Sequence, residues 1–262
     1  MKKFRLLLVF AASLSCFGQQ ARTAIYIARA VRLQWHNESR EEPDLSCTIC
    51  EVRKEKRFCP AIHGRICPQC CGEQREVTLD CPSDCQYLQR AREHEKPRPV
   101  EQIDAASMFL QVAVSEQFTY EREHLLMGLS YALAKAARAD RSLNDRDLIA
   151  ALSAMCASYD RLVNSGLHYE QPLAVPAQHA VAAEVEGMLK RYRETEEKER
   201  GYSNLHDSDV LKSLVFLLRL GQLRTSGRPK SRSFIDFIFA QFPEKQSAVF
   251  RPQEAASRII RP

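Results

Sequence analysis

The chain of 262 residues is 45% hydrophobic and 27% charged, which is the composition of an ordinary soluble globular protein with one large domain or two smaller ones. Its formal net charge of +5 is too small to indicate nucleic acid as the partner. No window is apolar over the ~18 or more residues that a membrane-spanning helix requires, so the sequence predicts no membrane span.

The N-terminus has the features of a secretory signal, because three basic side chains among the first five residues precede a short apolar run that ends at Cys16. The alternative is a start assigned too far upstream, with Val31 corresponding to a later start codon. We therefore expect residues 1–20 to be a signal-like or miscalled segment and residues 21–44 to be a linker.

Eight of the ten cysteines lie between residues 45 and 90, a stretch too short to bury a core of its own. A C-x2-C-x16-C-x2-C pattern, with the spacing of a four-cysteine zinc site, is formed by Cys47, Cys50, Cys67 and Cys70. Four further thiols are enough for a second complete site, namely Cys59, Cys71, Cys81 and Cys85. The sequence thus predicts a zinc-binding segment over residues 45–90, the cysteine module, with two ions.

The division of the thiols between two ions is one interpretation among several. The adjacent Cys70 and Cys71 point in different directions and so favour different ions, and His63 can replace one cysteine ligand. A disulfide framework and an iron–sulfur cluster are the alternatives to zinc. Paired Cys-x-x-Cys units favour reduced, metal-bound thiolates, so we predict a cytoplasmic protein; if the N-terminal signal is genuine, an exported protein with disulfides is the alternative.

Part of the module resembles a known motif. The segment from Cys59 to Gly72, followed by Cys81-Pro-Ser-Asp-Cys85, is similar to uncharacterised bacterial cysteine-rich proteins with the pattern CPA-x-x-G-x-x-C-x-x-CCG and then CP-x-DC. It also resembles, more distantly, the SEC-C zinc motif, although Ala61 stands where that motif has a cysteine ligand. The resemblance covers this module alone and implies metal binding with protein or ribosome-associated contacts, and no catalytic residue.

The charge of the module argues against a grip on nucleic acid. Between residues 45 and 90 seven basic side chains face six acidic ones, and eight thiolates with two Zn²⁺ add four negative charges, so the metal-bound module has a charge near −3. A surface that binds phosphate backbones needs clustered positive charge. We expect the basic run 53–57 to neutralise the thiolates instead.

Residues 91–103 read as a linker, and residues 104–262 as an all-α domain. Asn144 is a helix cap, and Gly166 and Gly221 are helix ends. Helices are predicted near residues 104–118, 120–139, 144–166, 176–199, 207–221 and 233–242. The fold class is therefore mainly α, with the cysteine module followed by a helical bundle or a solenoid-like array.

No catalytic constellation is evident. Glu121-x-x-His124 lacks the second Glu-x-x-His that a di-iron bundle needs, and Cys156 is expected to be a buried apolar residue. A basic run without acidic residues follows the fifth predicted helix and is either a solvated loop or an anion or nucleic-acid contact, through Arg224, Arg228, Lys230 and Arg232.

These observations favour a non-enzymatic protein with structural zinc that acts as an interaction or regulatory adaptor for a protein partner. Nucleic-acid or ribosome association through the two basic runs is the second hypothesis. A metal-dependent or redox enzyme is a third, and it requires an open coordination position or a reactive thiol pair.

Overall fold

The computed structural model describes residues 46–95, 99, 103–167 and 169–243, so the predicted segments 1–20 and 21–44 lie outside the described residues. The described residues are mainly helical, as the sequence predicts, and they also include one two-stranded sheet that it does not predict. None of the described helices is long and apolar enough to cross a membrane. The chain divides into two compact units, residues 1–56 and residues 57–262.

The described part of the first unit is a tight turn around Cys47 and Cys50. The Glu51 N–H donates to the Cys47 carbonyl at 2.7 Å, and the Cys47 N–H donates to the Arg53 carbonyl at 2.8 Å. Glu51 has a φ of 55°, in the left-handed region that few residues other than glycine adopt. This conformation lets the chain reverse directly after the second cysteine.

The second unit begins with a β-hairpin. Strands β1 (Arg57–Cys59) and β2 (Gly64–Ile66) pair antiparallel, with Phe58 opposite Arg65 on the exposed side and the side chains of Cys59 and Ile66 buried. The alternation follows from the pleat of a strand, which sends successive side chains to opposite faces.

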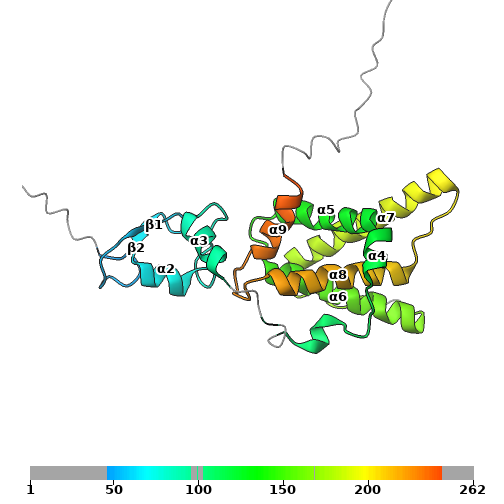
Figure 1. The fold of residues 1–262 in the computed structure, drawn as a ribbon, viewed down its shortest axis with the longest axis horizontal. Coiled ribbons are helices and arrows are strands. Elements are labelled where there is room, and N and C mark those ends of the chain that lie inside the picture. The colour runs from blue at the N-terminus through cyan, green and yellow to red at the C-terminus, as the bar shows by residue number, and fades with distance from the viewer. Residues whose placement is uncertain (1–45, 96–98, 100–102, 168, 244–262) are drawn as a thin grey trace, which may run out of the picture. The chain divides into compact units, whose positions relative to one another are not determined.

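Two short helices follow the hairpin (Figure 1), and a cysteine directly precedes each of them. Helix α2 (Pro68–Gln74) has Cys67 as its N-cap and proline at its first position, where the missing N–H costs nothing. Helix α3 (Gln86–His94) has Cys85 as its N-cap.

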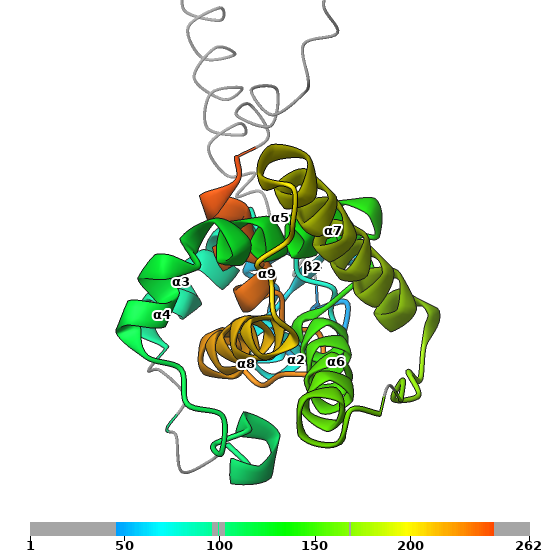
Figure 2. The same cartoon turned by 90° about the vertical axis from the view of Figure 1, so that its right-hand side faces the viewer.

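The remaining helices form a bundle (Figure 2), and we use helical bundle for α5 to α9. Helix α6 lies along α8, α5 lies along α7, and α6 also contacts α7, while α9 packs on α5 and α8. The bounds are α5 Glu123–Ala139, α6 Asp145–Ser165, α7 Pro176–Arg200, α8 Asp207–Arg224 and α9 Ser233–Gln241.

Apolar residues at helical spacing build the core of the bundle. Leu125, Leu129 and Leu133 recur every four residues along α5 and are completely buried. Helix α9 adds Phe234 and Ile235 to this core, and both are also completely buried.

The prediction of one helix over residues 104–118 is wrong. The structure has a short 3-10 turn, η2 (Ala105–Met108), and a separate helix α4 (Glu116–Glu121) capped by Ser115. The guanidinium of Arg219 in α8 donates to the carbonyls of Met108, Phe109 and Val112 at 2.6–2.9 Å. Phe109, which ends the 3-10 turn, has a φ of 48°, in the left-handed region that a helix does not continue through, and the contact with Arg219 holds the non-helical segment against α8.

Gly221 does not end its helix, because α8 continues to Arg224. A Cβ added at Gly221 would lie 2.9 Å from a ring carbon of Phe234 and 3.2 Å from a side-chain carbon of Ile149. The missing side chain therefore allows α8 to approach α9 and α6 closely, which is a packing role that outweighs the weak helix propensity of glycine.

Candidate metal centre

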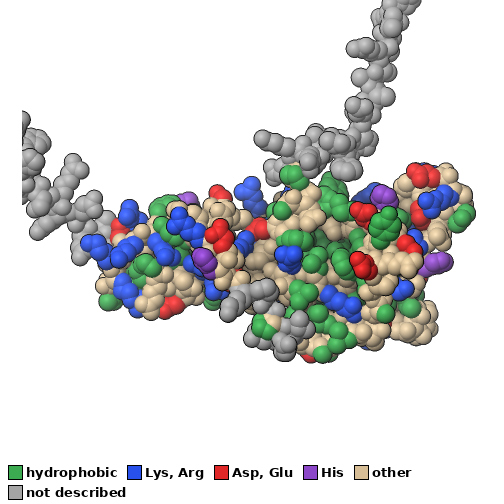
Figure 3. Space-filling view, viewed as in Figure 1, with side chains coloured by type: hydrophobic (Ala, Val, Ile, Leu, Met, Phe, Trp, Pro, Cys, Tyr) green, Lys and Arg blue, Asp and Glu red, His purple; other side chains and the backbone are tan. Residues whose placement is uncertain are grey.

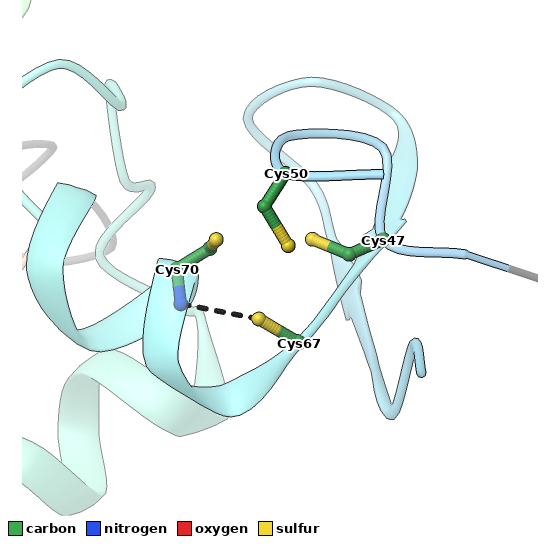
Figure 4. Close-up of side chains that lie close together, drawn as sticks. All are labelled: Cys47, Cys50, Cys67 and Cys70. Atoms are coloured by element: carbon green, nitrogen blue, oxygen red, sulfur yellow. Dashed lines mark hydrogen bonds between the residues drawn. The ribbon is translucent and has the colours of Figure 1, made fainter. Parts of the chain in front are cut away.

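Four cysteine side chains converge on one point (Figure 4). Cys47 and Cys50 come from the first turn, Cys67 precedes α2, and Cys70 lies in its first turn. Their sulfur atoms all lie within 4.8 Å of one another. The structure thus brings together the four thiols that the C-x2-C-x16-C-x2-C spacing groups.

The geometry of this group suits a single soft cation. A zinc ion with four sulfur ligands at ~2.3 Å places those sulfurs about 3.8 Å apart at the corners of a tetrahedron. Three of the four residues are buried, and the Cys70 N–H donates to the Cys67 sulfur at 3.4 Å. A donor aimed at sulfur favours the thiolate form that binds a metal. The group can therefore hold a metal ion.

The other four cysteines of the module line a small shared cavity. It has a volume of about 10 Å³, close to what one water molecule needs, and it is bordered by Cys59, Cys71, Cys81 and Cys85. Among the described residues, these sulfurs are not gathered into a group comparable to the first. They face one space and share it with apolar side chains such as Leu79 and Leu88.

The electrostatics around the second set are those of crowded thiols beside a cation. Burial raises the pKa of the Cys81 thiol, a hydrogen bond from the Glu76 backbone lowers it, and the neighbouring Cys59 and Cys85 raise it again. The guanidinium of Arg75 lies 3.8 Å from the Cys71 sulfur. Negative charge at several of these sulfurs requires a positive partner nearby, which a metal ion supplies.

The basic side chains of the module gather over β1, β2, α2 and α3 on the face shown in Figure 3. Arg57 stacks on the ring of Tyr87, with its guanidinium carbon 4.7 Å from the ring centre. His63 is exposed in the hairpin turn at a φ of 49°, and it is not part of the four-cysteine group.

The four basic residues predicted to contact an anion all have partners within the chain. Arg224 stacks on the ring of Phe237 at 4.4 Å, and Arg232 donates to the carbonyls of Arg141 and Leu143. Arg228 donates to the carbonyl of Arg75 at 2.9 Å. Lys230 donates to the Thr78 carbonyl and to Asp80, each at 2.9 Å. Anion binding by these residues stays a prediction.

A polar network around Glu76 joins the loop that follows α8 to the second half of the cysteine module. The sequence analysis does not predict this network. Glu76 is 1% exposed and accepts from Arg92 at 2.9 Å and from Ser226 at 3.2 Å. Arg92 also donates to Asp236 at 2.6 Å, and Asp236 accepts from Ser83. We call these residues the Glu76 network. No local pattern signals it, because its partners are separated by up to 153 residues.

Other candidates for chemistry are not assembled into a site. Glu121 ends α4 and His124 lies in α5, so the two are not on one helix, and both are exposed. Cys156 is completely buried in α6, and burial raises the pKa of its thiol, as expected of a residue that packs as a small apolar group.

The convergent cysteines are thus the feature of this chain with the clearest chemistry. Comparison with protein-family models, with curated proteins and with the solved structures gives no match, so the assignment rests on the geometry of the chain itself.

Proposed function

We propose that the cysteine module is a structural zinc centre with two ions. The observation that carries the proposal is the convergence of four sulfurs within 4.8 Å from two Cys-x-x-Cys units. Four thiolates complete the tetrahedral coordination of Zn²⁺ and leave no position for a catalytic water. The small cavity lined by the other four cysteines supports a second ion.

The metal content of the full chain, purified without added metal, tests this proposal. We expect two zinc ions per chain, one of them lost in Cys47→Ser/Cys67→Ser and the other lost in Cys81→Ser/Cys85→Ser. Cys156→Ala is the matched control and keeps both ions, because this cysteine is buried in the bundle. A parent chain that contains one zinc ion would contradict the second site. A parent chain that contains no zinc would contradict the whole proposal.

The same preparation distinguishes the alternatives to zinc. An iron–sulfur cluster absorbs visible light, whereas zinc thiolates do not. Disulfides appear as a loss of two mass units per bridge in the intact protein. A zinc centre with thiolate ligands is expected in a reducing compartment such as the cytoplasm. Oxidised cysteines without metal would support an exported protein instead.

We further propose that the module serves as an adaptor that contacts a protein partner. The support is the hairpin, whose Phe58 and Ile62 side chains are 55% and 38% exposed although both are large and apolar. Aromatic side chains are enriched at protein interfaces relative to the rest of the protein surface. The basic loop after α8 is turned toward partners within the chain, and this gives less support to nucleic-acid binding.

A photo-reactive amino acid placed at position 62 of the tagged full chain tests the adaptor role in cells. A discrete cross-linked protein that disappears in Phe58→Ser and persists in Val163→Ser is the expected result. Val163 is a comparable exposed aliphatic residue of the bundle, at 41% exposure. Cross-linking that Phe58→Ser leaves unchanged would contradict the proposed contact.

A further inference from the structure

A cavity of about 380 Å³ lies between α6, α8 and the loop that follows α8. This volume is within the range of sites for small organic ligands. The cavity contains no cysteine, so it is a different site from the group of four cysteines. Its lining combines two arginines, several uncharged polar groups and an apolar floor.

The side chains that line the cavity carry positive charge. Arg146 and Arg228 border the cavity, and none of the lining residues is acidic. Arg146 is exposed on the first turn of α6, and no hydrogen bond or ion pair engages its guanidinium within the part of the chain that the structure describes. Two guanidinium groups that share one cavity attract an anion and orient it through paired N–H donors.

Arg228 is held in place by the protein on one side. One terminal nitrogen donates to the Arg75 carbonyl at 2.9 Å, and the other lies 4.0 Å from a carboxylate oxygen of Glu95. A guanidinium has five N–H donors, so these two contacts leave donors for a ligand. Gly227, with a φ of 75°, makes the turn that precedes Arg228.

The rest of the lining supplies polar contacts and an apolar surface. Ser153 of α6 and Gln222 of α8 both border the cavity, and neither side chain has a hydrogen bond within the described residues. Ile149 and Ala150 provide the apolar part. With two arginines, a hydroxyl and an amide, the site offers more donors than the two oxygens of a carboxylate accept, whereas a phosphate monoester presents three terminal oxygens.

We propose that this cavity binds a small phosphorylated organic molecule. Arg146 and Arg228 bind its phosphate, Ser153 and Gln222 donate to the remaining oxygens, and its organic part packs on Ile149 and Ala150. The proposal goes beyond the zinc centre and assigns the helical bundle a ligand of its own.

Titration of the full chain with phenyl phosphate, followed by NMR at constant ionic strength, tests the site. Saturable shifts in α6 and α8 are expected, with weaker binding of inorganic phosphate, which lacks the ring, and of phenol, which lacks the charge. Arg146→Gln should weaken binding of phenyl phosphate about tenfold or more, because a charge-assisted hydrogen bond is lost. Benzoate binding as tightly as phenyl phosphate would overturn the preference for phosphate.

Arg161→Gln is the matched control, since it removes the same charge from the same helix about 22 Å away. Binding unchanged in Arg161→Gln and weakened in Arg146→Gln supports the site. Equal losses in both variants, or no saturable binding to the parent chain, would overturn it. A second variant, Ala150→Phe, fills the cavity while both arginines remain, and it should abolish binding if its thermal unfolding still shows a folded bundle.

Discussion

In the helical bundle leucine, valine and phenylalanine side chains fill the interior, whereas the buried apolar side chains of the cysteine module are mostly cysteines. Beside five buried cysteines, the module buries only three aliphatic residues, Ile66, Leu79 and Leu88. At roughly 25 cal/mol for each Å² of apolar surface removed from water, three such side chains cannot offset the ordering of some forty-five residues. The module therefore needs stabilisation beyond its own core, which the proposed metal ions would supply, whereas the bundle has a large apolar core.

Removal of metal should give the largest difference in stability between the cysteine module and the helical bundle. Because the binding of structural zinc by thiolates is worth ~10–16 kcal/mol at neutral pH, a chelator should unfold the module and leave the bundle folded. Hydrogen exchange measured by mass spectrometry is expected to become fast over residues 46–90 and to stay slow in α5 and α8. Equal loss of protection in both regions would show that the module is not a separately stabilised element.

Truncation of a side chain in the core of the bundle should have the opposite effect: it should destabilise the bundle and leave the cysteine module unchanged. Phe234 is completely buried between helices, so Phe234→Ala should lower the free energy of unfolding of the bundle by about 3–5 kcal/mol. Its metal content should not change. Phe58→Ala is the control, because Phe58 is 55% exposed and its loss is expected to cost less than about 0.5 kcal/mol. Denaturant unfolding measures both, and a small effect at Phe234 would contradict the assigned core.

The Glu76 network joins the two kinds of structure, and Arg92 is its centre. Arg92→Met removes the hydrogen bonds to the buried Glu76 and to Asp236, so we expect a loss of about 1–3 kcal/mol in unfolding free energy. Arg90→Met on the same helix is the control, since Arg90 is exposed and should give no measurable change. If the two variants unfold alike, the network does not contribute to stability.

The smallest expected effect is a dependence on pH inside the bundle. Burial raises the pKa of Asp145, although Ser231 and the N–H groups of Phe234 and Ile235 donate to it. A folded-state pKa above the unfolded value means that the folded chain holds this proton more tightly. The stability of the parent chain relative to Asp145→Asn should thus be greatest below the unfolded pKa, near 3.9, and fall as pH rises through the folded pKa.

Asp140 provides a control of opposite sign. Hydrogen bonds from Ser142 lower the pKa of Asp140, so its contribution is present above the unfolded pKa and is lost as pH falls through the folded pKa. Thermal unfolding of Asp145→Asn and Asp140→Asn across pH 3 to 7 should therefore give differences from the parent chain with opposite slopes. Slopes of the same sign would contradict the conclusion that burial disfavours the charged form of the Asp145 carboxyl.

Local signals in the sequence are sufficient for some elements and not for others. Helix α6 begins at the Asn144 cap and ends at Gly166 as predicted, because both signals act within a few residues. The segment 104–118 is not one helix, and Arg219, more than 100 residues later, holds part of it against α8. No local pattern contains that information.

The candidate sites divide in the same way. Cys47, Cys50, Cys67 and Cys70 lie close in the chain, and their spacing alone groups them. The cavity of α6 and α8 depends on the packing of two helices separated by α7. The sequence also gives no sign of the partners that the basic loop residues have within the chain, such as the Arg75 carbonyl for Arg228, because these partners are distant in sequence. Spacing predicts ligands within one turn or hairpin, and not contacts that the tertiary fold creates.

The Glu76 network also has a consequence for the order of events during synthesis. Ser226 follows Glu76 by 150 residues. At ~5–20 residues per second, the ribosome needs between about 8 and about 30 s to produce that partner. The four thiols of the first group are all translated by residue 70, so a group that can hold a metal ion is complete long before the loop after α8 exists. Until the loop after α8 has been synthesised, Glu76 lacks the hydrogen bond from Ser226.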